Sequence, residues 1–139
     1  MKITTRKTDN VVEVLSKVLE FTDRRSRVLH NNIVNVNTEN YRPADLDAAA
    51  FADLMAQALS EHLISGRLIM VDSEHVKFGE DGKFEAIPII DTQASQLLVT
   101  DRKQYLKHQM KKISENHMNK KVTAQLIERK QTKKTSLTN

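Results

Sequence analysis

A long helical repeat without any helix-breaking residue occupies the first part of the sequence. Neither glycine nor proline occurs before Pro43. Apolar or small residues recur here at alternating spacings of three and four, which is the repeat of one helix packing along another. The residues of this seam are Val12, Leu15, Leu19, Thr22, Ser26, Leu29, Ile33 and Val36. The sequence therefore predicts a helix from about Val11 that pairs with a second helix.

A second apolar stripe lies beside this seam on the same helix. It consists of Val11, Val14, Val18, Phe21 and Val28. One partner helix can cover one seam, so two stripes predict more than one neighbour for this helix. The polar residues 1–10 show no periodicity, and we expect them to be disordered, with Asp9 or Asn10 capping the helix start.

The Asn-rich segment after the helix predicts a tight turn. Asparagines such as Asn37 and Asn40 tolerate left-handed backbone and bond to neighbouring backbone groups. Pro43 then forces Arg42 out of the helical region. We assign residues 11–47 to one unit, the N-terminal helix with its turn.

Residues 48–96 form a middle region of different texture. Asp47 is placed as the cap of a short helix from Ala48 to about Leu63, and Gly66 is placed as its stop. Farther on, apolar and polar residues alternate on both sides of the glycines at 79 and 82, at Val76, Phe78, Phe84 and Ala86. This alternation predicts a β-hairpin or an extended loop.

A helical pattern returns at about Thr92. We assign residues 97–130 to a C-terminal helix and residues 131–139 to a disordered basic tail. Its apolar seam is interrupted by His117 and Lys120. The two terminal helices are expected to pair through Leu15, Leu19, Leu29 and Ile33 on the first and Leu106, Met110 and Ile113 on the second. The predicted fold is mainly α, with long terminal helices paired in a coiled-coil-like unit around a small middle region.

The composition limits the kinds of site that the chain can hold. Aromatic residues are 4% of the total and tryptophan is absent, so we expect a core of aliphatic residues rather than one centred on aromatics. Cysteine is absent, which excludes disulfides and thiolate metal sites. The polar start of the chain has no apolar segment of the signal-peptide kind, and no run reaches the ~18 to 20 apolar residues of a membrane span.

Charge is distributed unevenly along the chain. The net charge is +4, but residues 102–134 hold 11 Lys and Arg against two glutamates, whereas residues 1–101 hold 11 against 16 acidic residues. A basic C-terminal segment can bind nucleic acid or a membrane surface. It can also bind the acidic part of the same chain or of another copy, and we favour this second explanation.

No catalytic or metal-binding pattern emerges from the sequence. The five histidines form no HExxH motif and no cluster with ligand spacing. Asp45 and Asp47 have no general-acid partner, and their place after Pro43 favours turn and capping roles. We therefore predict no enzyme activity, no metal and no cofactor.

The helix end and the Asn-rich turn resemble a known family, the flagellar basal-body rod proteins, which carry a run similar to SNIANANTPGYK near the N-terminus. Here the run extends from Asn31 to Arg42, with Glu39 in place of the usual proline and Asn40 in place of the usual glycine. Asparagine is the next most tolerant residue of positive φ, so the second change is mild. The residues that we assign to this assembly motif are Asn32, Ile33, Asn35, Asn37, Thr38, Tyr41, Asp45 and Asp47.

Two further stretches narrow the resemblance to the FlgB-like proximal rod proteins. Residues 44–47 are similar to the ARDxDF continuation of that group, without its final Phe. Residues 109–118 are similar to the helix EMAKLAENQLRYEAL, although Lys120 stands where an aromatic residue is usual. The C-terminal matches are Met110, Lys112, Glu115 and Asn116.

The resemblance implies a structural subunit of the bacterial flagellum and not an enzyme. Such a subunit builds the proximal rod of the motor drive shaft in the periplasm and is needed for flagellum assembly and motility. It reaches its place through the flagellar type III export apparatus without a cleaved signal peptide. The implied partners are further copies of itself, FlgC-like rod proteins and a FliE-like adaptor, with no nucleic acid and no insertion into the membrane.

A second hypothesis comes from another class of protein. The basic C-terminal helix also suits a small helical regulator that binds nucleic acid or another protein. It lacks aromatics apart from Tyr105, and no helix-turn-helix motif is apparent. Strongly salt-dependent binding to DNA separates this hypothesis from the rod subunit.

Overall fold

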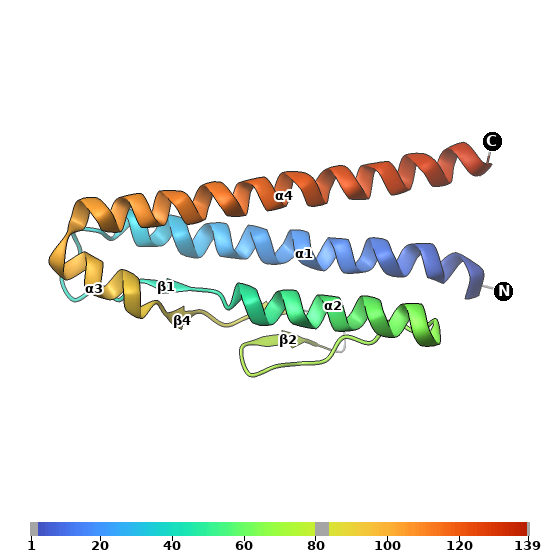
Figure 1. Ribbon diagram of the computed structural model, residues 1–139, viewed down its shortest axis with the longest axis horizontal. Coiled ribbons are helices and arrows are strands. Elements are labelled where there is room, and N and C mark those ends of the chain that lie inside the picture. The colour runs from blue at the N-terminus through green and yellow to red at the C-terminus, as the bar shows by residue number, and fades with distance from the viewer. Residues whose placement is uncertain (1–2, 80–83, 139) are drawn as a thin grey trace.

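The computed structural model describes residues 3–79 and 84–138, with side chains described for 11–79 and 84–132 (Figure 1). It confirms the predicted mainly helical fold with a small stranded region in the middle. The long helices are α1 (Ile3–Val34) and α4 (Arg102–Thr138), and the shorter ones are α2 (Ala48–Ser65) and α3 (Thr92–Thr100).

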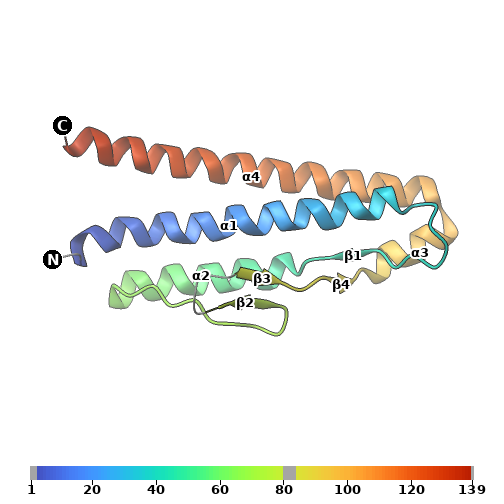
Figure 2. The same ribbon diagram turned by 180° about the vertical axis from the view of Figure 1, so that it is seen from behind.

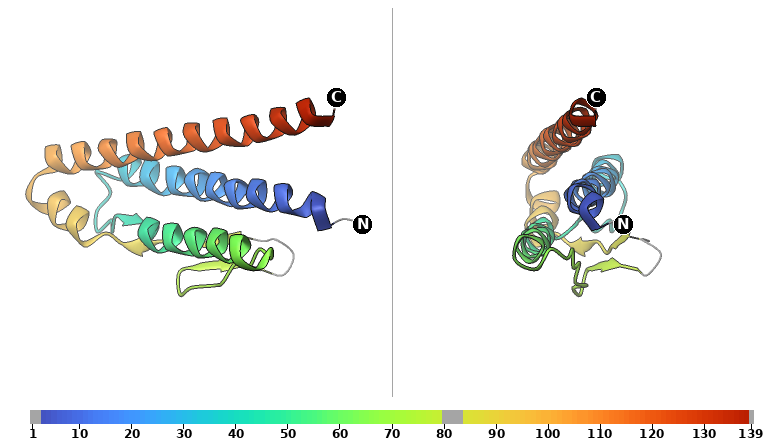
Figure 3. Two further views of the ribbon diagram at one scale, coloured as in Figure 1. Left: turned by 45° about the vertical axis from the view of Figure 1, so that its right-hand side comes forward. Right: turned by 90° about the vertical axis from the view of Figure 1, so that its right-hand side faces the viewer.

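The helices stack in three layers with α1 in the middle (Figures 1 and 3). On one side α4 runs antiparallel to α1, so that both ends of the chain lie at the same end of the molecule. On the other side lie α2 and the strands, as the rear view also shows (Figure 2). At the end remote from the termini, α3 closes the turn into α4.

Both apolar stripes of α1 have a neighbour within the chain. Val14 and Phe21 of the second stripe are buried in a core shared with Phe51 and Met55 of α2. On the seam, Leu29 is fully buried, and the backbone oxygen of Thr22 accepts a 2.7 Å hydrogen bond from Asn116 of α4. The two neighbours predicted for this helix are therefore α2 with the strands and α4.

Aromatic residues have a larger place in the core than we expected. Phe21 stacks on Phe51 with ring centroids 4.1 Å apart, and Phe84 meets Phe51 edge-on at 5.8 Å. Phe78 lies 5.6 Å from Phe84. The guanidinium of Arg24 lies over the ring of Phe84, 5.1 Å from its centroid. All four phenylalanines of the chain thus form one cluster, although they are far apart in sequence.

The ends of α2 follow from local chemistry. Asp47 caps its start by accepting a hydrogen bond from the backbone N–H of Ala50 at 3.0 Å. Gly66 ends it in the left-handed conformation, with φ of 73°, and its N–H donates to the carbonyl of His62. Both residues have the roles predicted for them.

Two pairs of short strands complete the middle region. β2 (Val76–Phe78) and β3 (Phe84–Ala86) pair antiparallel, which is the hairpin of the two predicted alternatives, and residues 80–83 between them lie outside the described residues. The hairpin packs on the core of its own chain through Val76 and Phe84. β1 (Ala44–Asp45) pairs antiparallel with β4 (Ile89–Ile90), which the sequence did not predict because two residues are too few to show a periodicity.

The long helices extend beyond their predicted bounds. α1 begins at Ile3 rather than at Val11, so the segment expected to be disordered continues the helix, and Met1 and Lys2 lie outside the described residues. α4 continues to Thr138 rather than ending at residue 130, and Asn139 lies outside the described residues. The reason in both cases is that neither glycine nor proline interrupts the helix.

The predicted C-terminal helix is divided in two at Asp101. This residue is extended, with φ of −156°, and its N–H donates to the carbonyl of Leu97 at the end of α3. Its carboxylate accepts a 3.2 Å hydrogen bond from the N–H of Gln104 and so begins α4. A capping residue therefore makes the corner that sends α4 back along α1.

None of the helices within residues 3–79 and 84–138 has the length and hydropathy needed to cross a membrane.

Replacing Phe51 by alanine should remove the central ring of the aromatic cluster. Phe51 is 4% exposed and contacts two other rings, so we expect the free energy of unfolding to fall by about 3 to 5 kcal/mol. Urea unfolding followed by circular dichroism measures the change. In the control Val99→Ala the lost side chain is 87% exposed, and the change should stay within about 0.5 kcal/mol. Similar losses in the two variants would contradict the assignment of the core.

Candidate functional site

The side chain of Asn32 lies at the centre of a buried polar network where α1, the turn and α4 meet. Its Nδ2 donates to the carbonyl of Ala44 at 2.7 Å and to Oε1 of Gln109 at 2.9 Å. Its Oδ1 accepts from the hydroxyl of Tyr41 at 2.8 Å and from the N–H of Ala44 at 3.1 Å. Asn32 is fully buried, and these bonds use the whole hydrogen-bonding capacity of its amide.

The segment between Asn32 and Tyr41 is a compact turn that its own side chains hold in place. Asn35 donates to the backbone and side-chain oxygens of Asn31, and the hydroxyl of Thr38 donates to the side chain of Asn35 at 3.0 Å. Asn40 has φ of 60°, the left-handed conformation that asparagine tolerates. The turn therefore brings Tyr41 back onto the helix that it left.

An ionic cluster lies beside the network formed by Asn32. The ammonium of Lys112 on α4 lies between two carboxylates, 2.8 Å from Asp45 and 2.7 Å from Asp91. The guanidinium of Arg25 on α1 binds Asp45 through two hydrogen bonds of 2.9 Å. The imidazole of His108 lies 3.7 Å from Asp91. The charged groups of Asp45, Asp91, Arg25 and Lys112 are each no more than 21% exposed.

The pairing of β1 with β4 brings the two carboxylates within reach of one lysine. Ala44 is the register partner of Ile90, and the N–H of Asp91 donates to the carbonyl of Pro43 at 3.0 Å. Asp91 also caps α3 by accepting from the N–H of Ala94. A single lysine can therefore reach both carboxylates, and it connects α4 to the strand pair and to the start of α3.

The ionisation of this cluster follows from its geometry. Burial alone would raise the pKa of Asp45, but the hydrogen bonds and charges of Arg25 and Lys112 outweigh it and lower that pKa. For Asp91, burial is likewise outweighed by the N–H of Ala94 and by Lys112, and the pKa is lowered. Burial would lower the pKa of Lys112, but its two carboxylate partners raise it. All four charges are present at neutral pH, and the lysine amine is not a nucleophile there.

Helix α4 faces α1 with polar residues. Tyr105, Gln109 and Asn116 are buried on this face, at spacings of four and seven. The hydroxyl of Tyr105 donates to the backbone oxygen of Asn32 at 2.8 Å, and burial is the main cause that raises the pKa of Tyr105 to about 12. The phenol therefore remains a hydrogen-bond donor over the whole neutral range.

The structure brings part of the predicted assembly motif together with part of the C-terminal motif. Asn32, Tyr41 and Asp45 meet the helix that carries Lys112 and Asn116. We call these five residues, together with Arg25, Asp91, Tyr105 and Gln109, the polar joint.

Other predicted residues of the assembly motif lie at the edges of the polar joint. Asn37 is exposed and accepts a 2.8 Å hydrogen bond from Arg102 of α4. Asn35 and Thr38 bond within the turn, and Asp47 caps α2. Ile33 is half-buried.

On the predicted helix-pairing seam, Leu29 is fully buried and five residues are half-buried: Leu15, Leu19, Ile33, Leu106 and Ile113. Met110 is 56% exposed, so it lies outside the buried face of α4, and Glu115 is exposed as well. The prediction placed the seam of α4 one residue away from the buried face because it followed apolar side chains.

Residues of the polar joint that were not predicted from the sequence are Tyr105, Gln109, Asp91 and Arg25. The first two share one helical face with Lys112 and Asn116, a signal that was present in the spacing but was hidden by polar residue types. For Asp91, the available signal was its place as an acidic residue just before a helix. No signal in the sequence connected it to Asp45.

The polar joint suits a structural role better than a chemical one. Its carboxylates are paired with cations, and its lysine and its two tyrosines are protonated at neutral pH, since the pKa of each is raised. Within the described part of the chain, no group of three or more His, Asp or Glu side chains could hold a metal ion.

No protein-family model, no curated protein and no solved structure matches this chain.

Replacing Asn32 by alanine should destabilise the protein strongly. The change leaves the N–H and C=O of Ala44 and the side chains of Tyr41 and Gln109 without their buried partner. We expect a loss of about 3 kcal/mol or more in the free energy of unfolding, measured with urea. The neighbouring control Asn31→Ala alters exposed bonds and should cost about 1 kcal/mol at most. Equal losses would show that the buried network contributes nothing of its own.

Replacing Asp45 by asparagine should change how stability depends on pH. A carboxyl whose pKa is lowered on folding stabilises the protein above its unfolded value of about 3.9, and this stabilisation is lost as the pH falls through the folded value. At neutral pH we expect the variant to be less stable by about 3 kcal/mol or more, because Arg25 and Lys112 lose a charged partner. The difference from the wild type should shrink below about pH 4.

Urea midpoints measured across the acidic range test this expectation. Asp53→Asn is the matched control for loss of one negative charge, because Asp53 is exposed. A difference between wild type and Asp45→Asn that stays constant into acid would exclude the paired carboxylate as its cause.

Proposed function

We propose that this chain is a non-enzymatic structural subunit of the bacterial flagellar basal body, belonging to the proximal rod. One observation carries the proposal. The two stretches that resemble proximal rod proteins, 67 positions apart at Asp45 and Lys112, meet in the polar joint. A chance resemblance in two separate stretches has no reason to coincide with one buried contact.

The form of the molecule supports the same proposal. The described chain is elongated, and its two long helices lie antiparallel with both termini at one end (Figure 1). The polar joint holds the turn against both helices, so the Asn-rich run has a structural role within the subunit. As partners we propose further copies of the chain, FlgC-like rod proteins, a FliE-like adaptor and the type III export apparatus.

Deletion of the gene tests the proposal most directly. We expect a non-motile strain that lacks the rod and everything distal to it, and motility should return when the gene is supplied on a plasmid. Electron microscopy of isolated basal bodies gives the structural readout. Normal swimming with intact basal bodies in the deletion strain would refute the proposal.

Complementation with two lysine variants adds a matched comparison. Lys112→Ala removes the cation between Asp45 and Asp91, and we expect it to restore motility poorly. Lys111→Ala removes an exposed lysine one position away and should restore motility. Protein levels measured by immunoblot separate loss of the subunit from loss of assembly.

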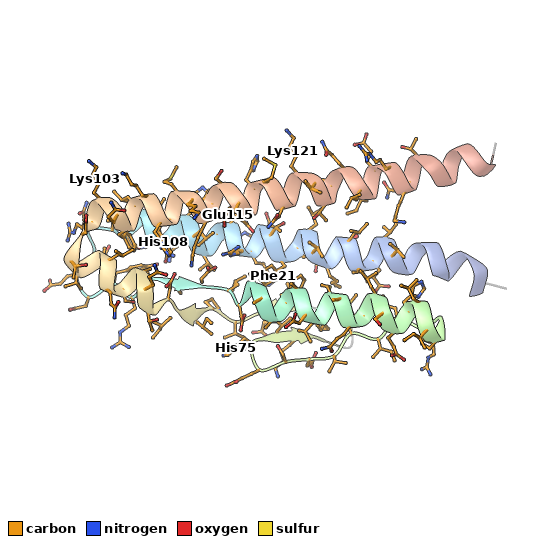
Figure 4. All side chains as sticks on the ribbon, viewed as in Figure 1. Phe21, His75, Lys103, His108, Glu115 and Lys121 are labelled. Carbon is orange, nitrogen blue, oxygen red and sulfur yellow. The ribbon has the colours of Figure 1, made fainter. Side chains whose placement is uncertain are left out.

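A second candidate function rests on the outer face of α4. Lys103 and Lys121 point away from α1 in Figure 4, and Lys107 and Lys111 are exposed on the same helix. Such a basic face suits the alternative of a small regulator that binds nucleic acid. Tight binding of labelled DNA that weakens steeply with salt would favour this candidate, whereas weak binding at physiological salt would exclude it.

A further inference from the structure

An apolar groove lies between α2 and α4, with α1 as its floor. It has a volume of about 490 Å³. The floor is formed by Val18, Phe21 and Thr22, and Arg25 lies at its end. The walls are lined by Ala48, Ala52, Met55, Ala56 and Leu59 of α2 and by Asn116, Asn119, Val122 and Thr123 of α4. Apart from the asparagines and Thr123, these walls offer no polar side chain.

The groove continues into apolar side chains that the chain itself leaves uncovered. On α2, Leu59 is 36% exposed and Leu63 is 84% exposed, one helical turn farther along. On α4, Val122 is 47% exposed and Leu126 follows at 40%. Alanines along the wall of α2 allow another backbone to approach closely. An exposed apolar surface of this length is typical of a site that binds a protein.

The total exposed surface supports the same conclusion. The chain exposes 9576 Å² at a mass of 15.9 kDa. A compact monomer of this mass exposes about 7,400 Å². The surplus of about 2,200 Å² exceeds the ~800 Å² that each partner commonly buries in a stable protein interface.

Charge determines which surfaces can meet when two copies face each other. α4 holds 11 Lys and Arg against two glutamates, so two α4 helices side by side repel each other. α2 holds no Lys or Arg, and its wall of the groove is uncharged, since neither Asp53 nor Glu61 lines the groove. An α4 helix that lies against α2 therefore avoids this repulsion. The favourable arrangement places α4 of one copy against α2 of the other.

We infer that the groove binds a second copy of this chain, with the two grooves facing each other across a two-fold axis parallel to the long helices. This axis pairs α4 of each copy with α2 of the other, and it does so at both grooves at once. α2 and α4 run in the same direction (Figure 1), and the axis preserves height along them. Ala56 and Val122 both line the groove, so the inferred arrangement brings Ala56 of one copy toward Val122 of the other. The inference does not depend on the flagellar proposal, since it uses only shape, surface and charge.

Sedimentation of the full chain over a range of concentrations tests for the dimer. The wild type should pass from 15.9 kDa to twice that mass as its concentration rises. Ala56→Arg places a long cation in the groove and should weaken dimerisation at least tenfold. The matched control Gln57→Arg adds the same charge to the same helix at a residue that lines a different surface depression, and it should dimerise like the wild type.

Cross-linking tests the direction of the axis. The chain has no cysteine, so two single variants, Ala56→Cys and Val122→Cys, carry the only thiols in a mixture. Under mild oxidation we expect the mixed disulfide, Ala56→Cys joined to Val122→Cys, to exceed either like-with-like product several-fold. Circular dichroism of each variant checks that the fold is kept, since both positions are partly exposed.

Three results would overturn the inference. A mass of 15.9 kDa at every concentration would exclude the dimer. Equal weakening by Ala56→Arg and Gln57→Arg would place the contact outside the groove. A preference for disulfides between two Val122→Cys chains would set α4 against α4 and exclude the proposed axis. None of these results bears on motility, so the rod proposal stands or falls separately.

Discussion

One ammonium group shared by two carboxylates connects the separate parts of this structure. Lys112 binds Asp45 in β1 and Asp91 at the start of α3, and Asp45 in turn binds Arg25 of α1. Each of these charges loses hydration on folding, which is costly unless the partners are held at the right distance. The β1–β4 pair, the Asn-rich turn and the start of α3 together hold the charged partners at that distance. Removing any one of them would leave a buried charge without its partner.

The polar joint explains why α1 and α4 pair in one register. Apolar seams tolerate sliding, because any Leu can replace another as a neighbour. The two helices cannot slide at Asn32, Gln109 and Asn116, since a shift of one turn would leave these buried amides without hydrogen bonds. The apolar core around Phe21 and Phe51 supplies most of the burial, and the polar residues select the alignment.

Local signals in the sequence predicted the local elements well. Asp47 and Gly66 act on neighbouring backbone, so the bounds of α2 could be read from residue type alone. The corner at Asp101 was also accessible, because Asp101 and Gln104 have the spacing of a capping box. The polar joint was only partly predictable. The resemblance singled out Asn32 and Lys112, but nothing in the sequence indicated that Asp91 reaches the same lysine, because that contact depends on two strands too short to show a pattern.

The aromatic cluster and the buried face of α4 were also not predictable from patterns in the sequence. A count of aromatic residues cannot reveal that all four phenylalanines meet, because the meeting is decided by the packing of α1, α2 and the hairpin. A search for apolar periodicity selected Met110 on α4, whereas the buried positions hold Tyr105, Gln109 and Asn116. Apolar periodicity identifies the buried face of a helix only when the buried residues are themselves apolar.

The pairing of the two ends of the chain also sets the order in which it can fold. Gln109 and Asn116 reach back 77 and 94 positions to their partners on α1. Until α4 has been synthesised, α1 has one of its two faces uncovered, Asn32 lacks Gln109 and Asp45 lacks Lys112. Contacts of such long range are slow to form, because a long loop must close before they give any stabilisation. A chain that emerges from the ribosome can bury its apolar core around Phe21 and Phe51 early, because every buried residue of that core precedes α4. It lacks the polar joint until its last third is complete, and during that time the uncovered face of α1 is open to capture by whatever binds incompletely folded chains.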